Sequence, residues 1–343
     1  MKKSLLALAV LTAFTGVASA QSSVTIYGKI DLGLVLDSGS ASGKSVRIDS
    51  GVTGGSRLGF KGVEDLGGGM KAAFQLETGF CADSAAGAPN FCTGGNNFMG
   101  RQAHGDLTGA FGAISAGRQY SLGFNNQATI DPFGAGFAGQ ANNVSAAGVY
   151  LVDPSGIRVN NSVQYTTPGF AGVTASAEVA FGEQTGNWAA NRETGGALTY
   201  ASGPAYAGFT YYDVDNAAGN GSGKKVYLLG GTYDFGVVKA HALVQKVTGA
   251  AGLDFFSYMG GATIPLAGGQ VLASYIHHND RSSLNQDASQ LGVGYLYPLS
   301  KRTSVYTSFA KINNQHGAAF LVGNATATGT GDKSFDFGVV HNF

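Results

Sequence analysis

Long apolar runs are missing from most of this chain of 343 residues. After the first 20 positions, no segment reaches the roughly 18 consecutive apolar residues that a transmembrane helix requires. Proline is scarce, with 7 residues, and only 12% of the residues are charged, so the composition is atypical of a disordered protein. An excess of positive charge is also absent, because 21 basic residues face 21 acidic ones. This balance excludes nucleic acid as an expected partner.

Glycine and aromatic residues, by contrast, are abundant. The chain contains 55 Gly, 15 Tyr and 21 Phe. This combination is typical of a protein built from many strands and turns, so we predict the all-β class. No Pro-rich linker, charge block or shift in composition divides the chain. We therefore expect a single domain over residues 21–343.

The N-terminal segment has the pattern of a secretory signal peptide. Lys2 and Lys3 precede an apolar stretch over residues 5–17, and Ala18-Ser19-Ala20 supplies the small residues of a cleavage site. We expect residues 1–20 to be removed, which leaves 19 basic and 21 acidic residues. The sequence thus predicts an exported protein.

Apolar and polar residues alternate along several segments. Residues 24–36 show the pattern first, and residues 157–165 and 173–181 repeat it. A period of two predicts strands whose two faces meet different surroundings. The apolar face would be the core of a soluble sandwich, or the lipid-facing surface of an outer-membrane barrel.

Loop lengths favour the barrel. Long polar segments, such as 37–55, 81–97, 213–223 and 313–331, are separated by seven short turns rich in Gly, Pro and Asp. The short turns lie at residues 65–69, 108–112, 168–172, 202–205, 234–236, 265–269 and 298–301. Short connections at one end and long ones at the other are typical of transmembrane barrels. Seven turns join fourteen strands, and a first and a last strand give sixteen, enough to enclose an aqueous channel. We predict a 16-stranded antiparallel transmembrane β-barrel.

One long segment interrupts the alternation. About 36 residues separate Gln119 from Ile157, and a connection of this length is usually functional or disordered. A surface loop is one interpretation. We favour a pore loop, over about 121–156, that folds into the barrel and narrows it.

The C-terminal residue, Phe343, ends an alternating apolar run. We expect this last strand to pair with the first strand near Val24, because pairing removes two edges that could not persist in lipid. The ring of Phe343 would then lie on the lipid face near the periplasmic interface.

Ordered motifs along the mature chain resemble the general diffusion porins of β-proteobacteria, including the neisserial type. The motifs are Gln21-Ser22-Ser23-Val24-Thr25-Ile26-Tyr27-Gly28, Ser56-Arg57-Leu58-Gly59-Phe60-Lys61-Gly62-Val63-Glu64-Asp65-Leu66-Gly67, Gln75-Leu76-Glu77-Thr78-Gly79-Phe80, Gly117-Arg118-Gln119, Asn161-Ser162-Val163-Gln164-Tyr165 and His341-Asn342-Phe343. The resemblance implies a homotrimer in the outer membrane of a Gram-negative bacterium, within lipid and lipopolysaccharide. Each barrel would carry a water-filled pore for passive diffusion of ions and small hydrophilic solutes, with its third loop folded inward. Phe343 matches the terminal residue that the barrel-assembly machinery reads in such proteins.

Charged residues of the predicted strands then become candidates for a pore constriction. Strand alternation points Arg57, Lys61, Glu77 and Arg158 inward. The resemblance implies a cluster formed by Arg57, Arg101 and Arg158, with Glu77 and Asp131 opposite. Arg101 shares its phase with apolar residues, so it either bends inward or lies in a subunit interface. Fixed positive charge in a narrow passage favours anions; the alternative is that these groups pair as salt bridges of the wall.

Cys81 and Cys92 are the only cysteines. Because the protein is expected to be exported, we predict a disulfide between them. It would stiffen the second long loop, which the resemblance places against a neighbouring subunit.

No arrangement in the sequence predicts catalysis. No Ser/His/Asp set can be ordered, and no spacing of ligands indicates a metal site or a cofactor. Two other functions stay open: an outer-membrane hydrolase, and an adhesin or structural barrel without conduction.

Overall fold

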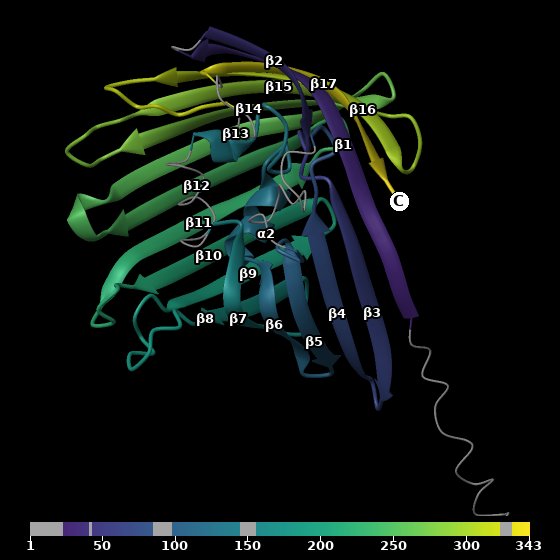
Figure 1. Cartoon of the computed structure of the whole chain (residues 1–343), viewed down its shortest axis with the longest axis vertical. Helices are drawn as coiled ribbons and strands as arrows, with labels where there is room; N and C mark the ends of the chain where they lie inside the picture. The colour runs from purple at the N-terminus through teal and green to yellow at the C-terminus, as the bar shows by residue number, and fades with distance from the viewer. Residues whose placement is uncertain (1–22, 41–42, 85–97, 145–155, 323–330) are drawn as a thin grey trace, which may run out of the picture.

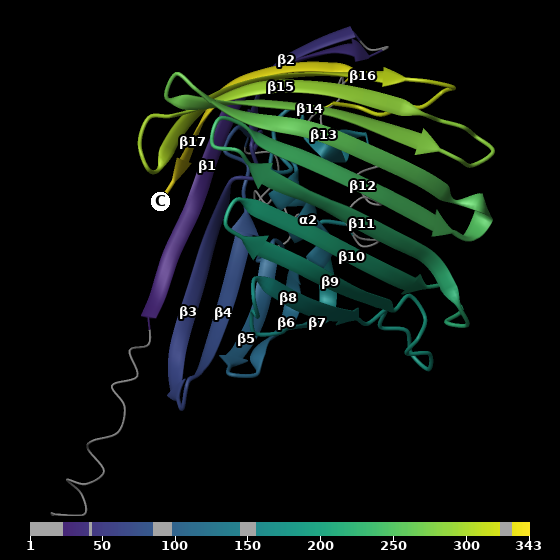
Figure 2. The same cartoon turned by 180° about the vertical axis from the view of Figure 1, so that it is seen from behind.

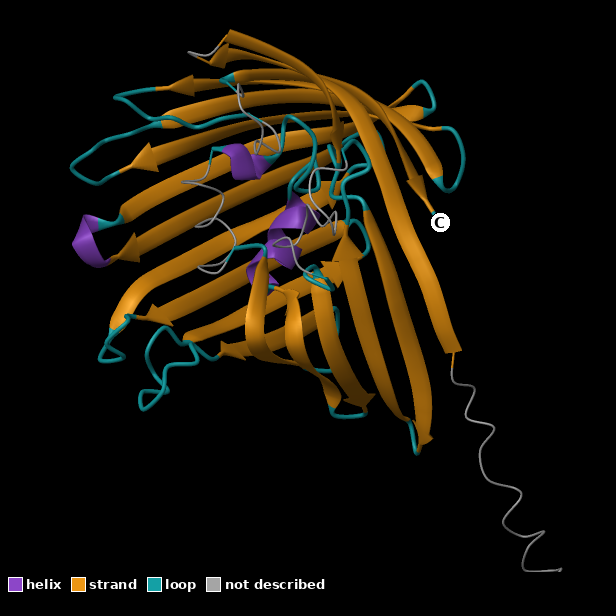
Figure 3. Cartoon of the chain, in the orientation of Figure 1, coloured by secondary structure: helices purple, strands orange, loops and turns teal. Residues whose placement is uncertain are grey.

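The computed structural model describes residues 23–40, 43–84, 98–144, 156–322 and 331–343. The predicted signal peptide lies outside these residues. Within them, seventeen strand segments form one antiparallel sheet (Figures 1 and 3). The strands are β1 (Ser23–Ser40), β2 (Gly43–Ser50), β3 (Arg57–Gly67), β4 (Met70–Gly79), β5 (Gln102–Gly109), β6 (Gly112–Tyr120), β7 (Arg158–Thr166), β8 (Val173–Ala180), β9 (Glu193–Ser202), β10 (Ala205–Asp215), β11 (Ser222–Asp234), β12 (Lys239–Gly249), β13 (Asp254–Leu266), β14 (Gly269–Asp280), β15 (Ala288–Pro298), β16 (Thr303–Asn314) and β17 (Lys333–Asn342).

Three helical segments accompany the described strands. They are α2 (Leu122–Ile130), η1 (Ala141–Asn143) and η3 (Ala250–Gly252). No helix in the described ranges is long and apolar enough to cross a membrane.

The sheet closes on itself through its first and last strands. β1 pairs antiparallel with β17, from Lys29 opposite Asn342 to Ser38 opposite Lys333. Its other edge pairs with β3 near its start and with β2 near its end, so β2 and β3 are two pieces of one interrupted strand. Counted in this way, the described residues form a closed barrel of sixteen strands, as predicted (Figures 1 and 2).

The terminal residue completes this closure. The backbone N–H of Phe343 donates to the carbonyl of Gly28 at 3.0 Å, and Gly28 donates in return at 2.9 Å. The Phe343 ring covers Gly28, because a Cβ atom at position 28 would lie 2.2 Å from the Cζ atom of the ring. The predicted pairing of the two ends is confirmed.

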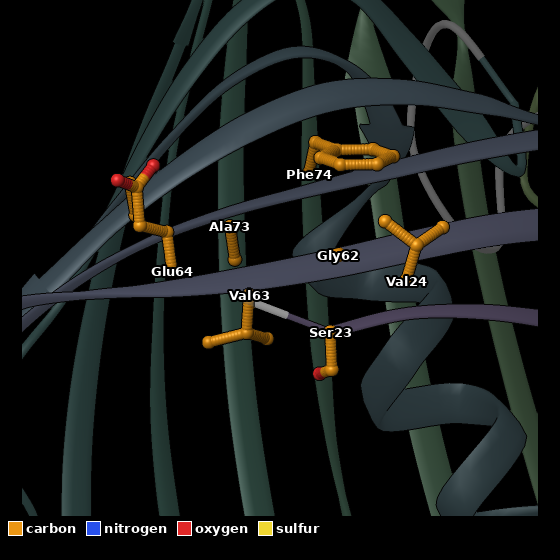
Figure 4. Close-up of a pocket in the computed structure, with 8 residues that line it drawn as sticks. Ser23, Val24, Gly62, Val63, Glu64, Ala73 and Phe74 are labelled. Carbon is orange, nitrogen blue, oxygen red and sulfur yellow. The ribbon is translucent and has the colours of Figure 1, made fainter. Parts of the chain in front are cut away.

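The apolar residues of the alternating pattern lie on the outer surface. On β1, Val24 is 67% exposed, whereas Asp31 in the opposite phase is completely buried. Figure 4 shows Val24, Gly62 and Phe74 at a pocket on β1, β3 and β4. Gly62 pairs with Phe74 across the strands, and a Cβ atom there would lie 2.3 Å from the ring. Glycine thus leaves space for an aromatic side chain on this surface.

The short and long connections divide between the two ends of the barrel (Figure 1). Each of the seven predicted short turns joins two neighbouring strands of a hairpin, from the turn between β3 and β4 to that between β15 and β16. Asp234 shows how such a turn is held, since its Oδ1 accepts the N–H of Gly236 at 2.8 Å.

The segment 37–55, predicted as a long polar loop, is mostly strand. It contains the end of β1 and the whole of β2, with Val46 and Ile48 exposed on the outside. On the other face, Arg47 contacts Asp37 at 2.6 Å and Asp49 at 2.7 Å. These ion pairs place opposite charges next to each other within the sheet, which stabilises a hairpin formed by a polar sequence.

Candidate pore constriction

The pore loop lies inside the barrel. Both opposite views place α2 within the ring of strands (Figures 1 and 2). The helix begins after Ser121, whose Oγ accepts the N–H of Phe124 at 3.1 Å. The predicted inward folding of the third loop is confirmed for residues 121–144; residues 145–155 lie outside the described part.

Apolar side chains fix the loop to one side of the wall. Ile130, Ala138, Ala141 and Val144 pack with buried residues of β11 to β16 in one cluster. Phe133 and Phe137 pack in a second cluster, whose wall residues are Val35, Val52, Leu272, Tyr306 and Val340. The loop therefore occupies lumen on the side of the later strands and leaves the wall of β3 to β7 facing it.

Polar groups of the wall complete the docking. The backbone N–H of Ala138 donates to Asp336 at 2.9 Å, and Gln290 donates to the carbonyl groups of Gly139 and Gln140, each at 3.0 Å. Ring atom Nδ1 of His241 contacts the carbonyl of Ile130 at 2.7 Å. Backbone N–H and carbonyl groups of the loop that are buried against the wall thus have hydrogen-bond partners there.

Asp131 is part of this loop architecture. It is only 3% exposed, and its carboxylate accepts the N–H groups of Phe133, Ala135 and Ala141 at 3.0, 3.3 and 2.9 Å. Burial raises the pKa of this carboxyl group to about 6. The structure therefore places Asp131 as a buried acceptor of backbone N–H groups within the loop.

Glu77 on β4 is the acceptor that two arginines of the wall contact. It is 2% exposed. Its Oε1 accepts from Nε of Arg101 at 2.7 Å and lies 3.8 Å from Nη1 of Arg57, and its Oε2 accepts from the Tyr27 hydroxyl at 3.0 Å. Lys61 lies farther along β3, with Nζ 5.4 Å from the centre of the Tyr27 ring. The inward phase predicted for Arg57, Lys61 and Glu77 matches these contacts.

The side chain of Arg101 bends inward to contact other residues of the wall, which is one of its two predicted placements. It immediately precedes β5, so the alternation of that strand does not determine where its side chain points. Its Nη2 donates to the Tyr120 hydroxyl at 2.7 Å.

Arg158, at the start of β7, reaches the same hydroxyl. Its Nη2 donates to Tyr120 at 3.2 Å, and its guanidinium lies 4.7 Å from the centre of the Tyr120 ring. The structure thus brings Arg57, Arg101 and Arg158 into one chain of contacts through Glu77 and Tyr120.

Two members of this chain of contacts were absent from the sequence prediction. Tyr27 and Tyr120 carry no charge, so a search for pore charges does not select them. A register shift between Gly117 and Gln119 also interrupts the alternation of β6 just before Tyr120. Gly117, which lies between the short turn at 108–112 and the long segment after Gln119, was the available signal of such a bulge.

Cys81 follows β4 in the described part of the chain, whereas Cys92 lies outside it. The disulfide between them therefore stays a prediction. Among the described residues, no group of three or more His, Cys, Asp or Glu side chains is arranged to hold a metal ion.

Comparisons with known proteins agree with this architecture. The family described as Gram-negative porin matches residues 7–317. Outer membrane porin protein 32 of Delftia acidovorans is 37% identical over 330 residues, covering 92% of this chain and 90% of that protein. Major outer membrane protein P.IB of Neisseria meningitidis serogroup B is 29% identical over 355 residues, covering 97% and 100%.

Among solved structures, the anion-selective porin from Comamonas acidovorans superposes with a TM-score of 0.80. It is 31% identical in sequence, and the match covers 94% of this chain and 100% of that one.

Proposed function

Because this chain belongs to the Gram-negative porin family and is an outer-membrane protein, we propose that it forms a water-filled diffusion channel with a preference for anions. The observation that carries the proposal is the imbalance of charge on the wall opposite the pore loop. In the described part of the chain, Glu77 contacts Arg57 and Arg101, and Arg158 joins this group through the Tyr120 hydroxyl.

This excess of positive charge determines which ion is stabilised when it enters the pore. Glu77 neutralises about one of the three guanidinium charges, and Asp131 is occupied by backbone groups of the loop. An ion that loses hydration in a narrow passage is stabilised by fixed charge of opposite sign. Arginine stays charged at any physiological pH, so the preference would be permanent. The likeness to the anion-selective porin from Comamonas acidovorans supports the same assignment.

The remaining proposals follow from family membership. We propose that residues 1–20 are a signal peptide, that residues 21–343 form one barrel domain, and that three copies assemble within lipid and lipopolysaccharide. Cys81 and Cys92 would form a disulfide, and Phe343 would be read by the assembly machinery. Ions and small hydrophilic solutes would cross by passive diffusion, without catalysis, cofactor or metal, because the relatives are channels.

Planar-bilayer recording of the purified protein in a KCl gradient tests the proposal. We expect stable conductance steps in groups of three, with a reversal potential shifted toward the chloride equilibrium potential. A protein that inserts without conductance would favour a structural barrel, and a reversal potential on the potassium side would contradict the anion preference.

A further inference from the structure

Tyr120 lies between two positive charges. Its hydroxyl oxygen accepts from Nη2 of Arg101 at 2.7 Å and from Nη2 of Arg158 at 3.2 Å. A phenol oxygen can accept two hydrogen bonds, so one neutral atom holds two guanidinium groups side by side. The two guanidinium groups repel each other, and the hydrogen bonds to the shared acceptor offset part of that repulsion.

The two arginines depend on Tyr120 to different degrees. Arg101 also donates to Glu77 at 2.7 Å. Arg158 contacts the ring and hydroxyl of Tyr120, and its buried Nε has no hydrogen-bond partner among the described residues. The position of Arg158 therefore depends chiefly on Tyr120.

Tyr120 is itself held from two sides. Its ring stacks on Phe124 of α2, with centroids 4.8 Å apart and planes inclined by 25°. Its carbonyl accepts from Nε2 of Gln164 on β7 at 2.9 Å. The pore loop and the wall thus meet at this side chain.

We propose that Tyr120 is a positioning residue of the constriction, which fixes Arg101 and Arg158 as a pair and couples them to the pore loop. This inference rests on the anion preference proposed above. The number of charges governs the preference for chloride over potassium, whereas their fixed separation governs how well a polyatomic anion accepts from both guanidinium groups at once. Tyr120 contributes to the second property only.

The substitution Tyr120→Phe separates the two properties. It keeps the ring that stacks on Phe124 and removes the shared acceptor. Reversal potentials in a KCl gradient report the charge, and block of the chloride current by added inorganic phosphate reports the position. We expect an unchanged reversal potential and a phosphate concentration for half-block raised at least about three-fold, since a hydrogen bond to a charged group is lost. Arg158→Ala should change both readouts.

Tyr206→Phe is the matched control. Tyr206 also contacts α2 through its hydroxyl, but donates to Asn126. It should leave phosphate block unchanged.

Three results would overturn the role of Tyr120. The first is a phosphate concentration for half-block that is the same in Tyr120→Phe as in the wild type. The second is a rise of that concentration in Tyr206→Phe equal to the rise in Tyr120→Phe. The third is a wild-type channel that phosphate does not block. A wild-type channel without anion preference would instead overturn the proposed function, and this inference with it.

Discussion

At the scale of single residues, Glu77 and Asp131 show that two acidic groups in one lumen have different tasks. Glu77 accepts from a wall arginine and a tyrosine, whereas Asp131 accepts three backbone N–H groups of its own loop. Both were predicted to lie at the constriction, because residue type and a family pattern indicate a charge but not its partners. The regular strands did allow the inward direction of Arg57, Lys61 and Glu77 to be predicted, since alternation holds there.

Replacing Glu77 with Gln should strengthen the anion preference. The amide keeps an oxygen for Arg101 but removes the negative charge, so the three arginines act unopposed. We expect the ratio of chloride to potassium permeability to rise about two- to five-fold, the effect of one charge at short range in a wet pore. Reversal potentials measure this ratio.

Glu64→Gln is a suitable control for that experiment. Glu64 lies on β3 near its turn and is exposed, so the same change of charge occurs far from the arginines. A shift toward potassium in Glu77→Gln, or equal shifts in both variants, would contradict the assigned role.

At the scale of elements, the pore loop is a segment whose location could be predicted and whose internal structure could not. Its length and its position between two alternating segments indicated a lumenal loop. The helix α2 and the backbone bonds to Asp131 and Asp336 depend on side chains that meet only in the folded barrel. The division of one strand into β2 and β3 escaped prediction for the same reason, because ion pairs of Arg47 hold the first part in the sheet.

Asp131→Ala should loosen the pore loop without opening the barrel. The change leaves three backbone N–H groups without their acceptor, at a cost of about 2–4 kcal/mol in the docking of the loop. We expect larger open-channel current noise and faster proteolytic cleavage within residues 121–144, with an unchanged thermal unfolding temperature of the barrel.

Asp234→Ala provides the comparison, because Asp234 also accepts a backbone N–H but lies in an exposed turn. Quiet currents in Asp131→Ala would show that the apolar clusters alone fix the loop.

At the scale of the whole molecule, the barrel closes through the pairing of β1 with β17 and through the Phe343 ring at the end of that seam. Alternation, turn composition and the apolar C-terminus were sufficient to predict sixteen strands and the pairing of the ends, because each is a pattern of residues that are close together in the sequence. The space that Gly28 leaves for the Phe343 ring is a tertiary contact, which no local pattern indicates.

Deletion of Phe343 should reduce assembly far more than conductance. Gly28→Val should act in the same direction, because its Cβ atom would overlap the ring at 2.2 Å. The yield of folded barrels can be measured by heat-modifiable mobility in detergent gels, and conductance from the channels that do form. Phe170→Ala, at a residue 83% exposed in a turn, should retain the wild-type yield. Normal yield without Phe343 would show that the seam closes without this contact.

The reversal potential in a KCl gradient shows whether the arginines select the permeating ion. It is measured for the wild-type channel, Arg57→Ala, Arg158→Ala and the control Arg302→Ala, at an exposed residue in the turn between β15 and β16. We expect both wall substitutions to move the reversal potential toward the potassium equilibrium potential, while Arg302→Ala leaves it unchanged. An ion preference that survives both wall substitutions, or one that Arg302→Ala changes equally, would contradict the claim that the arginines gathered around Glu77 and Tyr120 select the permeating ion.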